Sequence, residues 1–304
     1  MIRQGEQGNE TCGMKLASIV DGATRTWGLI EPLEGVPDAG ARLATPALRL
    51  QFPGLRDVLA AGALPDLRPA LAAAPLRSLA GLAFDPVVPD PSRIICVGIN
   101  YLAHIHEMGR EKPDYPTLFT RFPDTLVGHG QAIVRPRISS QFDYEGELAI
   151  VIGKTARYVS AATALDHVAG YTCLLDGSVR DWQRHTTQFT PGKNFPATGG
   201  CGPWLVTTDE IPDPAALRLT TRVNGEVLQQ AAVSDLCFGV RRIIEYCSSF
   251  CALNPGDIIA TGTPSGVGFA RQPPRWLTPG DTVEVAISGI GILRHQVVDE
   301  APAS

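Results

Sequence analysis

Residues 142–154 place three acids in the first half of an otherwise apolar stretch, Phe-Asp-Tyr-Glu-Gly-Glu-Leu-Ala-Ile-Val-Ile-Gly-Lys. Its β-branched residues and closing Gly-Lys turn predict a strand over residues 143–152. Side chains two residues apart leave the same strand face, roughly 7 Å apart, so Glu145 and Glu147 should point the same way. Two buried like charges repel each other, and a hard cation between them would remove that cost. The alternative is a solvated face, which the apolar run 148–152 disfavours.

A third ligand is expected at Asp176, which ends an apolar stretch and precedes Gly177, where the backbone can bend sharply. An aspartate at a strand end also commonly caps a turn, so Asp176 alone is a weak signal. Three carboxylates without a nearby His or Cys set favour Mg²⁺ or Mn²⁺, with waters completing an octahedron. The sequence therefore predicts one Mg²⁺ or Mn²⁺ per chain, held by Glu145, Glu147 and Asp176.

The composition limits the fold class. Charged residues make up only 19% of the 304 residues, while 31 glycines and 25 prolines favour turns and short strands over long helices. A net charge of −5 gives no reason to expect nucleic acid or an anionic membrane as a partner. The strands and few helices, without strict βαβ alternation, predict an α+β protein that is predominantly β.

The chain divides into three predicted parts. Residues 1–13 are polar, lack the apolar core of a secretory signal and are expected to be a disordered extension. Residues 14–90 form a small N-terminal domain, which ends at a proline-rich linker, and residues 91–304 form the larger domain. Seven cysteines without paired spacing indicate reduced thiols and a cytoplasmic protein.

The larger domain contains further predicted elements. A helix is expected over residues 102–108, followed by a long loop over residues 112–124 that is rich in proline and aromatic residues and is typical of a binding loop. Asn224-Gly225 predicts a β-hairpin, and residues 235–250 have one apolar helix face.

His104 and Glu107 share one face of the first of these helices, at i and i+3. They could be a general base and the carboxylate that orients it. An exposed helix pair worth a few tenths of a kcal/mol is the alternative, and spacing alone favours it. His106 faces elsewhere and is expected at the surface.

Cationic and polar residues follow the third acid. Arg180, Gln183 and Lys193 could hold a substrate carboxylate, although ordinary surface charge is an equal alternative. Thr263 lies in a Gly-rich turn, residues 261–268, whose backbone N–H groups could cradle an anion. The turn is not a P-loop, because no Lys-Ser/Thr follows.

Together these segments resemble the fumarylacetoacetate hydrolase family over residues 93–298. The motifs occur in the family's order: Gly98-Ile-Asn-Tyr-Leu-Ala-His104-Ile-His-Glu107, Asp143-Tyr-Glu145-Gly-Glu147-Leu, Gly170-Tyr-Thr-Cys-Leu-Leu-Asp176, Arg180-Asp-Trp-Gln183, Gly192-Lys193-Asn-Phe, Gly202-Pro-Trp, Val223-Asn-Gly-Glu226 and Pro255-Gly-Asp-Ile-Ile-Ala-Thr-Gly-Thr263-Pro-Ser-Gly-Val-Gly268. The chain departs from the family's usual residues at Leu175 and Gly177, on either side of the third acid. These departures bear on the substrate and not on the metal.

The resemblance implies a mixed-sheet β-roll, a homodimer and one Mg²⁺ or Mn²⁺ on the three acids. It also implies a catalytic His104–Glu107 dyad on a segment that orders over the substrate. Lys193 would assist catalysis, and Arg180, Gln183, Lys193 and Thr263 would line the substrate pocket.

The first functional hypothesis is metal-dependent hydrolysis of a C–C bond in a 2,4-dioxo acid, such as an acylpyruvate or a fumarylpyruvate-like compound, in the catabolism of aromatic compounds. The metal would act as a Lewis acid, and His104 would activate the attacking water. The alternative is an isomerase, tautomerase or decarboxylase acting on a related oxo acid such as oxaloacetate. A hypothesis of another class is a metal-binding ligand sensor without turnover.

Overall fold

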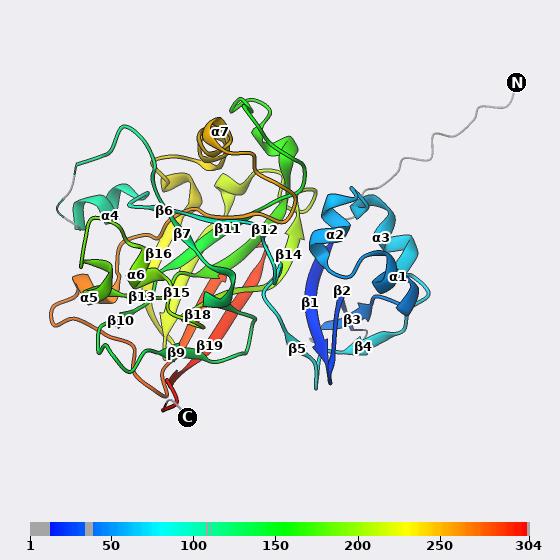
Figure 1. Ribbon diagram of the computed structural model, residues 1–304, viewed down its shortest axis with the longest axis horizontal. Coiled ribbons are helices and arrows are strands. Elements are labelled where there is room, and N and C mark those ends of the chain that lie inside the picture. Colours follow the sequence, from blue (N-terminus) through cyan, green and yellow to red (C-terminus); the bar gives the residue numbers. More distant parts are fainter. Residues whose placement is uncertain (1–12, 34–38, 108, 110, 303–304) are drawn as a thin grey trace, which may run out of the picture.

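The computed structural model describes residues 13–33, 39–107, 109 and 111–302. The predicted extension, residues 1–13, lies outside these ranges except for its last residue. The prediction of an α+β, predominantly β fold with mixed sheets is confirmed: two sheets form the larger part of the molecule, and helices lie at its periphery (Figure 1). No helix among the described residues is long and apolar enough to cross a membrane.

The largest sheet has twelve strands within the described residues. Its path is β4 (Leu76–Ser78), β3 (Ala39–Leu43), β2 (Thr24–Pro32), β1 (Lys15–Asp21), β14 (Gly199–Thr207), β12 (Val168–Leu175), β11 (Gly146–Ile152), β17 (Ile258–Ala260), β6 (Ile94–Gly98) and β7 (Thr117–Arg121), with β5 (Ala83–Phe84) beside β1 and β8 (Leu126–Val127) beside β14. Every residue of β11 and β12 is buried. Burial on both faces explains why these strands are continuous apolar runs without alternation.

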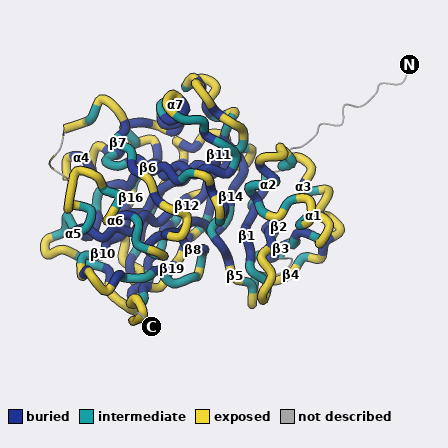
Figure 2. Tube along the Cα trace, viewed as in Figure 1, coloured by how far each residue is buried: buried dark blue, intermediate teal, exposed yellow. Residues whose placement is uncertain are grey.

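A second sheet packs against the centre of the first, through β11, β12 and β14. Its order is β16 (Glu226–Ala232), β15 (Arg218–Val223), β18 (Thr282–Ile287), β19 (Gly291–Asp299) and β9 (Ile133–Arg135), and a two-stranded sheet of β10 (Phe142–Asp143) and β13 (Ser178–Val179) lies nearby. Alternate residues of β18 and β19 are buried, which is typical of a sheet with one face on the core. The predicted hairpin joins β15 to β16 at Asn224-Gly225. Figure 2 shows the buried strands enclosed by exposed loops.

The helices are short. They are α1 (Pro46–Gln51), α2 (Leu55–Ala60), α3 (Leu64–Leu71), α4 (Leu102–Glu107), α5 (Arg180–Gln183), α6 (Thr190–Lys193) and α7 (Val240–Phe250), with 3₁₀ turns at Pro123–Thr125, Ala164–His167, Pro214–Ala216, Val233–Asp235 and Gly268–Ala270. The apolar face predicted over residues 235–250 belongs to α7, but the helix starts only after Gly239, its N-cap. The prediction placed its start too early because Val233–Asp235 is a separate 3₁₀ turn.

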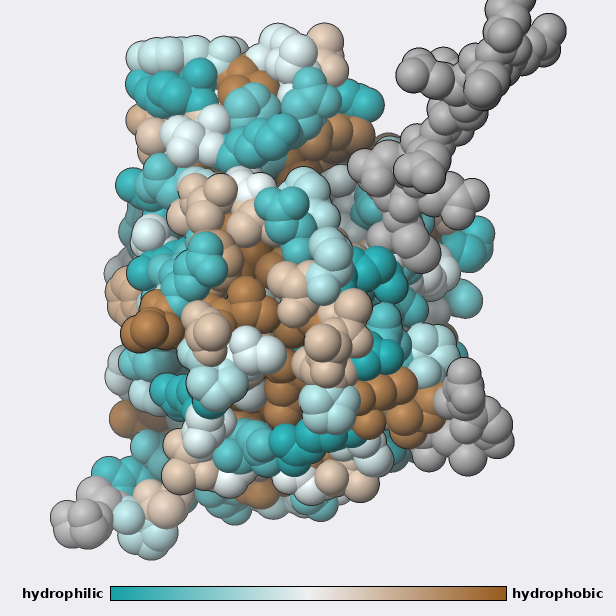
Figure 3. Space-filling view, turned by 90° about the vertical axis from the view of Figure 1, so that its right-hand side faces the viewer, coloured by the Kyte–Doolittle hydropathy of each residue, from teal (hydrophilic) through white to brown (hydrophobic). Residues whose placement is uncertain are grey.

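The strands and helices before residue 91 lie at one end of the molecule, which faces the reader in Figure 3 with apolar and hydrophilic residues mixed on its surface. Their sheet is continuous with the larger one, since β1 pairs with β14 at Lys15–Val206 and Leu16–Leu205. Trp27 is fully buried beneath α1–α3, and its indole N–H donates to the carbonyl of Phe52 (2.8 Å). The domain boundary at residue 90 remains a prediction.

The acidic stretch is not a single strand, and this part of the prediction is wrong. β10 ends at Asp143 and β11 begins at Gly146, so Glu145 lies in the connection between two sheets. The chain leaves the β10 pairing because the Asp143 carboxylate accepts the N–H of Tyr144 (2.8 Å) and the side chain of Gln229 accepts the N–H of Gly146 (3.0 Å). These bonds depend on the tertiary fold, which a periodicity argument does not include.

The predicted long loop over residues 112–124 is also wrong in part. It contains β7, which pairs with β6 and forms one edge of the large sheet. Prolines on both sides of this short strand hid it in the sequence, because proline is typical of loops and of edge strands alike.

Candidate metal centre

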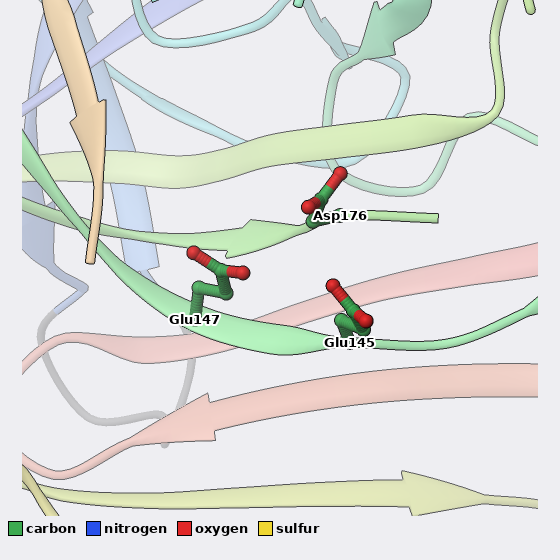
Figure 4. A group of neighbouring side chains, drawn as sticks. All are labelled: Glu145, Glu147 and Asp176. Carbon is green, nitrogen blue, oxygen red and sulfur yellow. The ribbon is translucent and has the colours of Figure 1, made fainter. Parts of the chain in front are cut away.

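Three acidic side chains converge inside the larger domain. One oxygen of each of Glu145, Glu147 and Asp176 lies within 4.8 Å of the others, and all three residues are buried (Figure 4). Antiparallel pairing of β11 with β12 sets Gly146 opposite Leu175, so the acids that flank this pair become neighbours. The structure therefore brings together the three predicted metal-ligating residues from two adjacent strand ends.

Buried cations surround two of these carboxylates. The ammonium of Lys193 lies 2.6 Å from Glu145 Oε2 and 2.6 Å from Asp176 Oδ2, and Arg180 Nη2 lies 2.7 Å from Glu145 Oε1. Burial alone would raise the pKa of Glu145, but Arg180 and Lys193 outweigh it and hold that pKa well below its usual range. Burial would lower the pKa of Lys193, but Asp176 and Glu145 raise it. These groups form a buried ion cluster, in which Glu145 and Lys193 carry opposite charges at neutral pH.

Glu147 is different, because none of the cationic side chains that the structure describes forms an ion pair with it. Its Oε2 accepts the backbone N–H of Gly262 (2.7 Å). Burial, together with the neighbouring Asp176 and Glu145, raises the pKa of Glu147 well above its usual range. This carboxylate therefore carries an uncompensated electrostatic cost, which a divalent cation would remove.

A count of the buried charges leads to the same conclusion. With Glu147 deprotonated, as metal binding requires, the cluster contains four buried carboxylates (Asp143, Glu145, Glu147 and Asp176) and three buried cations (Arg121, Arg180 and Lys193), which leaves one negative charge in excess. The oxygen donors suit Mg²⁺ or Mn²⁺. The donor set thus fits the predicted ion through Glu145, Glu147 and Asp176.

Arg121 was not recognised from the sequence. It ends β7 and is 2% exposed, and its guanidinium donates to Asp176 Oδ1, to the carbonyl of Gly177 (2.9 Å), to Thr125 Oγ1 (3.1 Å) and to Thr198 Oγ1 (2.9 Å). It therefore fixes the orientation of the Asp176 carboxylate from the side opposite Lys193. Only recognition of β7 as a strand of the large sheet could have indicated this role.

Asp143 anchors Arg180 and does not belong to the triad. Its Oδ2 accepts Nε–H of Arg180 (2.8 Å), and its two oxygens also accept the backbone N–H groups of Gly268 (2.8 Å) and Phe269 (3.0 Å). Arg180 Nη1 in turn donates to Gln183 Oε1 (2.9 Å). The guanidinium is therefore held on two sides before any substrate arrives.

The predicted dyad is assembled on α4. His104 Nδ1 lies 2.8 Å from Glu107 Oε2, and Glu107 Oε1 accepts the backbone N–H of Gly266 (2.8 Å). His104 is only 4% exposed, so the alternative of an exposed helix pair does not describe it. With Nδ1 bound to the carboxylate, Nε2 is the nitrogen that can exchange a proton with a bound molecule.

The Gly-rich turn binds carboxylates of the protein itself. The N–H of Gly262 is used by Glu147, that of Gly266 by Glu107 and that of Gly268 by Asp143. These three N–H groups are therefore already paired within the protein, and the expectation that the turn cradles a substrate anion stays a prediction for its other N–H groups.

Gln229 is a second residue that the sequence did not indicate. Its side chain accepts the N–H of Gly146 (3.0 Å) and donates to Thr263 Oγ1 (2.7 Å) and to the carbonyl of Pro264 (2.9 Å). Thr263 itself donates to the carbonyl of Gly146 (3.0 Å). Gln229 and Thr263 thus tie the turn to the start of β11, between the two glutamates.

A small cavity of about 70 Å³ opens above the acids. Its lining comprises Val97, Gly98, Ile99, His104, Phe119, Glu145, Glu147, Arg180, Gln183, Arg184, Phe189, Lys193 and Thr263. All the predicted substrate-binding residues are among them, whereas Glu107 and Asp176 contact lining residues from behind. The rings of Phe119 and Phe189 pack edge to face, with centroids 5.8 Å apart, and form an apolar wall that the sequence analysis did not predict.

Comparison with known proteins agrees with this arrangement. The profile described as "Fumarylacetoacetate (FAA) hydrolase C-terminal" matches residues 93–298. The oxaloacetate tautomerase YisK of Bacillus subtilis is 44% identical over 226 residues, which cover 73% of this chain and 75% of that protein.

Solved structures extend the similarity to nearly the whole chain. The 2-hydroxyhepta-2,4-diene-1,7-dioate isomerase of Mycobacterium marinum covers 95% of this chain and 100% of its own, with a TM-score of 0.77 and 33% identity. Maleylpyruvate hydrolase of Sphingobium sp. SYK-6, in complex with manganese(II) and pyruvate, covers the same shares with a TM-score of 0.76 and 28% identity. These similar proteins act on oxo acids or their enol forms, by tautomerisation, isomerisation or hydrolysis.

Proposed function

We propose that this chain, which belongs to the fumarylacetoacetate hydrolase family, is a metal-dependent enzyme that interconverts the keto and enol forms of oxaloacetate. The observation that carries this proposal is a buried histidine, oriented by a carboxylate, that lines the same small cavity as two acids of the candidate metal centre. The similarity to a curated oxaloacetate tautomerase supports the choice of substrate.

The proposed chemistry is enolisation of a 2-oxo acid. A divalent ion held by Glu145, Glu147 and Asp176 would supply a Lewis acid that stabilises negative charge on the 2-oxo oxygen. Maleylpyruvate hydrolase, which holds manganese(II) and pyruvate in a similar fold, supports both the ion and the oxo-acid ligand.

The residues of the chain have separate roles in this proposal. Arg180, fixed by Asp143, binds the carboxylate next to the oxo group through charge-assisted hydrogen bonds. The ammonium of Lys193 donates a hydrogen bond to the oxygen that becomes negatively charged. His104 Nε2 removes a proton from C3 and returns it to that oxygen, and Glu107 stabilises the imidazolium formed between the two steps.

Hydrolysis of a C–C bond is the second candidate, and one observation favours it: maleylpyruvate hydrolase shares the fold at a TM-score of 0.76. The same His104 could activate a water molecule. However, hydrolysis requires a water molecule beside a longer substrate, and the similarity to an oxaloacetate tautomerase supports the reaction without added water.

The test follows both reactions in parallel. Decay of the enol absorbance of oxaloacetate is measured with Mg²⁺ or Mn²⁺, and an acylpyruvate panel is analysed for cleavage products. We expect accelerated tautomerisation of oxaloacetate without loss of carbon dioxide. Tautomerisation at the uncatalysed rate, together with cleavage of an acylpyruvate, would replace the first candidate by the second.

We also propose that the protein is a cytoplasmic homodimer that prefers Mg²⁺ or Mn²⁺ over softer ions. Light scattering coupled to size-exclusion chromatography checks the assembly. A monomer at micromolar concentration would contradict it.

A further inference from the structure

A second guanidinium borders the cavity beyond the buried ion cluster. Arg184 follows α5 directly as its C-cap and lies four residues after Arg180, so both side chains leave the same side of this turn. Arg180 is buried at the cavity floor, whereas Arg184 is exposed and lines the opening. The guanidinium carbons of Arg180 and Arg184 lie 5.8 and 3.8 Å from the centroid of the same Phe269 ring, so both positive charges are near one ring.

An aromatic ring fixes the second guanidinium. The Arg184 guanidinium carbon lies 3.8 Å from the ring centroid of Phe269, which is the geometry of stacking over an aromatic face. The backbone N–H of Phe269 is bound by Asp143 (3.0 Å), the carboxylate that also orients Arg180 (2.8 Å). One buried aspartate thus determines the positions of both arginines.

We propose that Arg184 binds the distal carboxylate of the substrate and makes the site selective for short dicarboxylic acids over the corresponding monocarboxylic acids that lack the distal carboxyl group. This inference rests on the proposed function, because it assumes that the 2-oxo carboxylate end lies at the ion cluster. Because both guanidiniums lie near the Phe269 ring, one four-carbon diacid can reach both of them. On the Phe119–Phe189 side of the cavity, the ammonium of Lys193 lies 4.9 Å from the Phe119 ring centroid and is paired with Glu145 and Asp176, so we infer that the diacid extends toward Arg184.

Malate and lactate form a matched pair of probes. Both are unreactive 2-hydroxy acids, and malate differs from lactate in carrying a distal carboxylate. Calorimetric titration of the Mg²⁺-loaded protein gives the two dissociation constants. We expect malate to bind at least about tenfold more tightly than lactate, which is a typical factor for a hydrogen bond to a charged group. Added salt should reduce this preference, because Arg184 is exposed.

Variants assign the preference to this side chain. In Arg184→Gln the affinity ratio should fall to about one while lactate binding stays unchanged, and Arg184→Lys should retain part of the preference. Arg242→Gln, which removes a surface arginine paired with Glu245 on α7, serves as the matched control and should keep the wild-type ratio.

The outcomes separate this inference from the proposed function. Equal affinities for malate and lactate in the wild type, or an unchanged ratio in Arg184→Gln, overturn the role of Arg184 even if oxaloacetate is tautomerised. If the preference is lost in Arg184→Gln, the inference is supported even when oxaloacetate is not turned over. A lack of turnover contradicts only the proposed reaction. Failure of both acids to bind overturns the inference as well.

Discussion

The ion cluster and the catalytic dyad border the same cavity but are held in different ways. The cluster is buried between strand ends and the helices α5 and α6, and its members bind one another or buried neighbours; it comprises Arg121, Asp143, Glu145, Glu147, Asp176, Arg180 and Lys193. The dyad (His104 and Glu107) lies on a six-residue helix near the surface.

Hydrogen bonds at both ends attach the dyad segment to the rest of the protein. At its start, the side chain of Asn100 binds the carbonyl of Thr261 (2.8 Å) and both backbone groups of Phe238 (2.9 and 3.0 Å). At its end, the Glu107–Gly266 bond is the contact that joins it to the Gly-rich turn (2.8 Å). The comparison indicates that the cluster is organised before the substrate arrives, whereas the geometry of the dyad depends on a few hydrogen bonds.

The largest effect is expected at the carboxylate of the cluster whose negative charge is least compensated. Glu147→Ala should abolish metal-dependent activity, because it removes a predicted metal ligand whose negative charge is disfavoured by burial and by the neighbouring Asp176 and Glu145. The protein should remain folded, since the substitution leaves no unpaired buried carboxylate. Calorimetry with Mn²⁺ and circular dichroism measure the two quantities, with Glu226→Ala on the exposed hairpin as control. Wild-type Mn²⁺ affinity in Glu147→Ala would remove this residue from the metal centre.

The dyad should affect the rate and not the metal. His104→Ala should slow enolisation by about 10²–10⁴-fold, the usual contribution of a positioned base. Metal affinity should stay unchanged, because a hard ion has its oxygen ligands without the imidazole. Single-turnover kinetics at saturating Mg²⁺ gives the rate. If more metal restores the lost rate, His104 belongs to the metal site and the distinction between the two regions is wrong.

The sequence indicated the ion cluster and the dyad, but it did not indicate the contacts that hold their side chains in place. Glu145, Glu147 and His104 could be found because acids in an apolar strand and an i, i+3 pair leave local patterns. Arg121 and Gln229 could not be found in this way, because each binds a partner that is distant along the chain, 55 residues away for Arg121 and 83 for Gln229. Contacts of that kind depend on strand order, which short-range periodicity does not determine.

The buried ion pairs of the cluster should contribute strongly to the unfolding free energy of the protein. Arg121→Met removes a cation that binds Asp176 and leaves that carboxylate buried with one partner fewer. Breaking a buried ion pair in this way typically costs about 3–5 kcal/mol of unfolding free energy. Urea denaturation measures it, with Arg77→Met as the control at an exposed pair with Asp21. A loss no greater than that of the control would mean that the cluster is not the rigid region.

The smallest effect tests how the dyad depends on its attachments. Glu107 accepts two hydrogen bonds, from His104 Nδ1 and from the N–H of Gly266, and glutamine can accept only one of them. If the amide nitrogen of Glu107→Gln faces Gly266, two donors meet and the segment is released. If it faces His104, Nδ1 is favoured as the acceptor, so that the tautomer with an unprotonated Nε2, which acts as the base, becomes less populated. Both outcomes lower the rate, by about tenfold for the loss of one charged hydrogen bond.

Since the two residues act as a unit, adding Glu107→Gln to His104→Ala should change the rate little further. The measurement is single-turnover enolisation, with Glu111→Gln, at an exposed position of the same segment, as the matched control. A wild-type rate in Glu107→Gln, or additive losses in the double variant, would show that the imidazole is positioned by other contacts and that the dyad is as firmly held as the ion cluster.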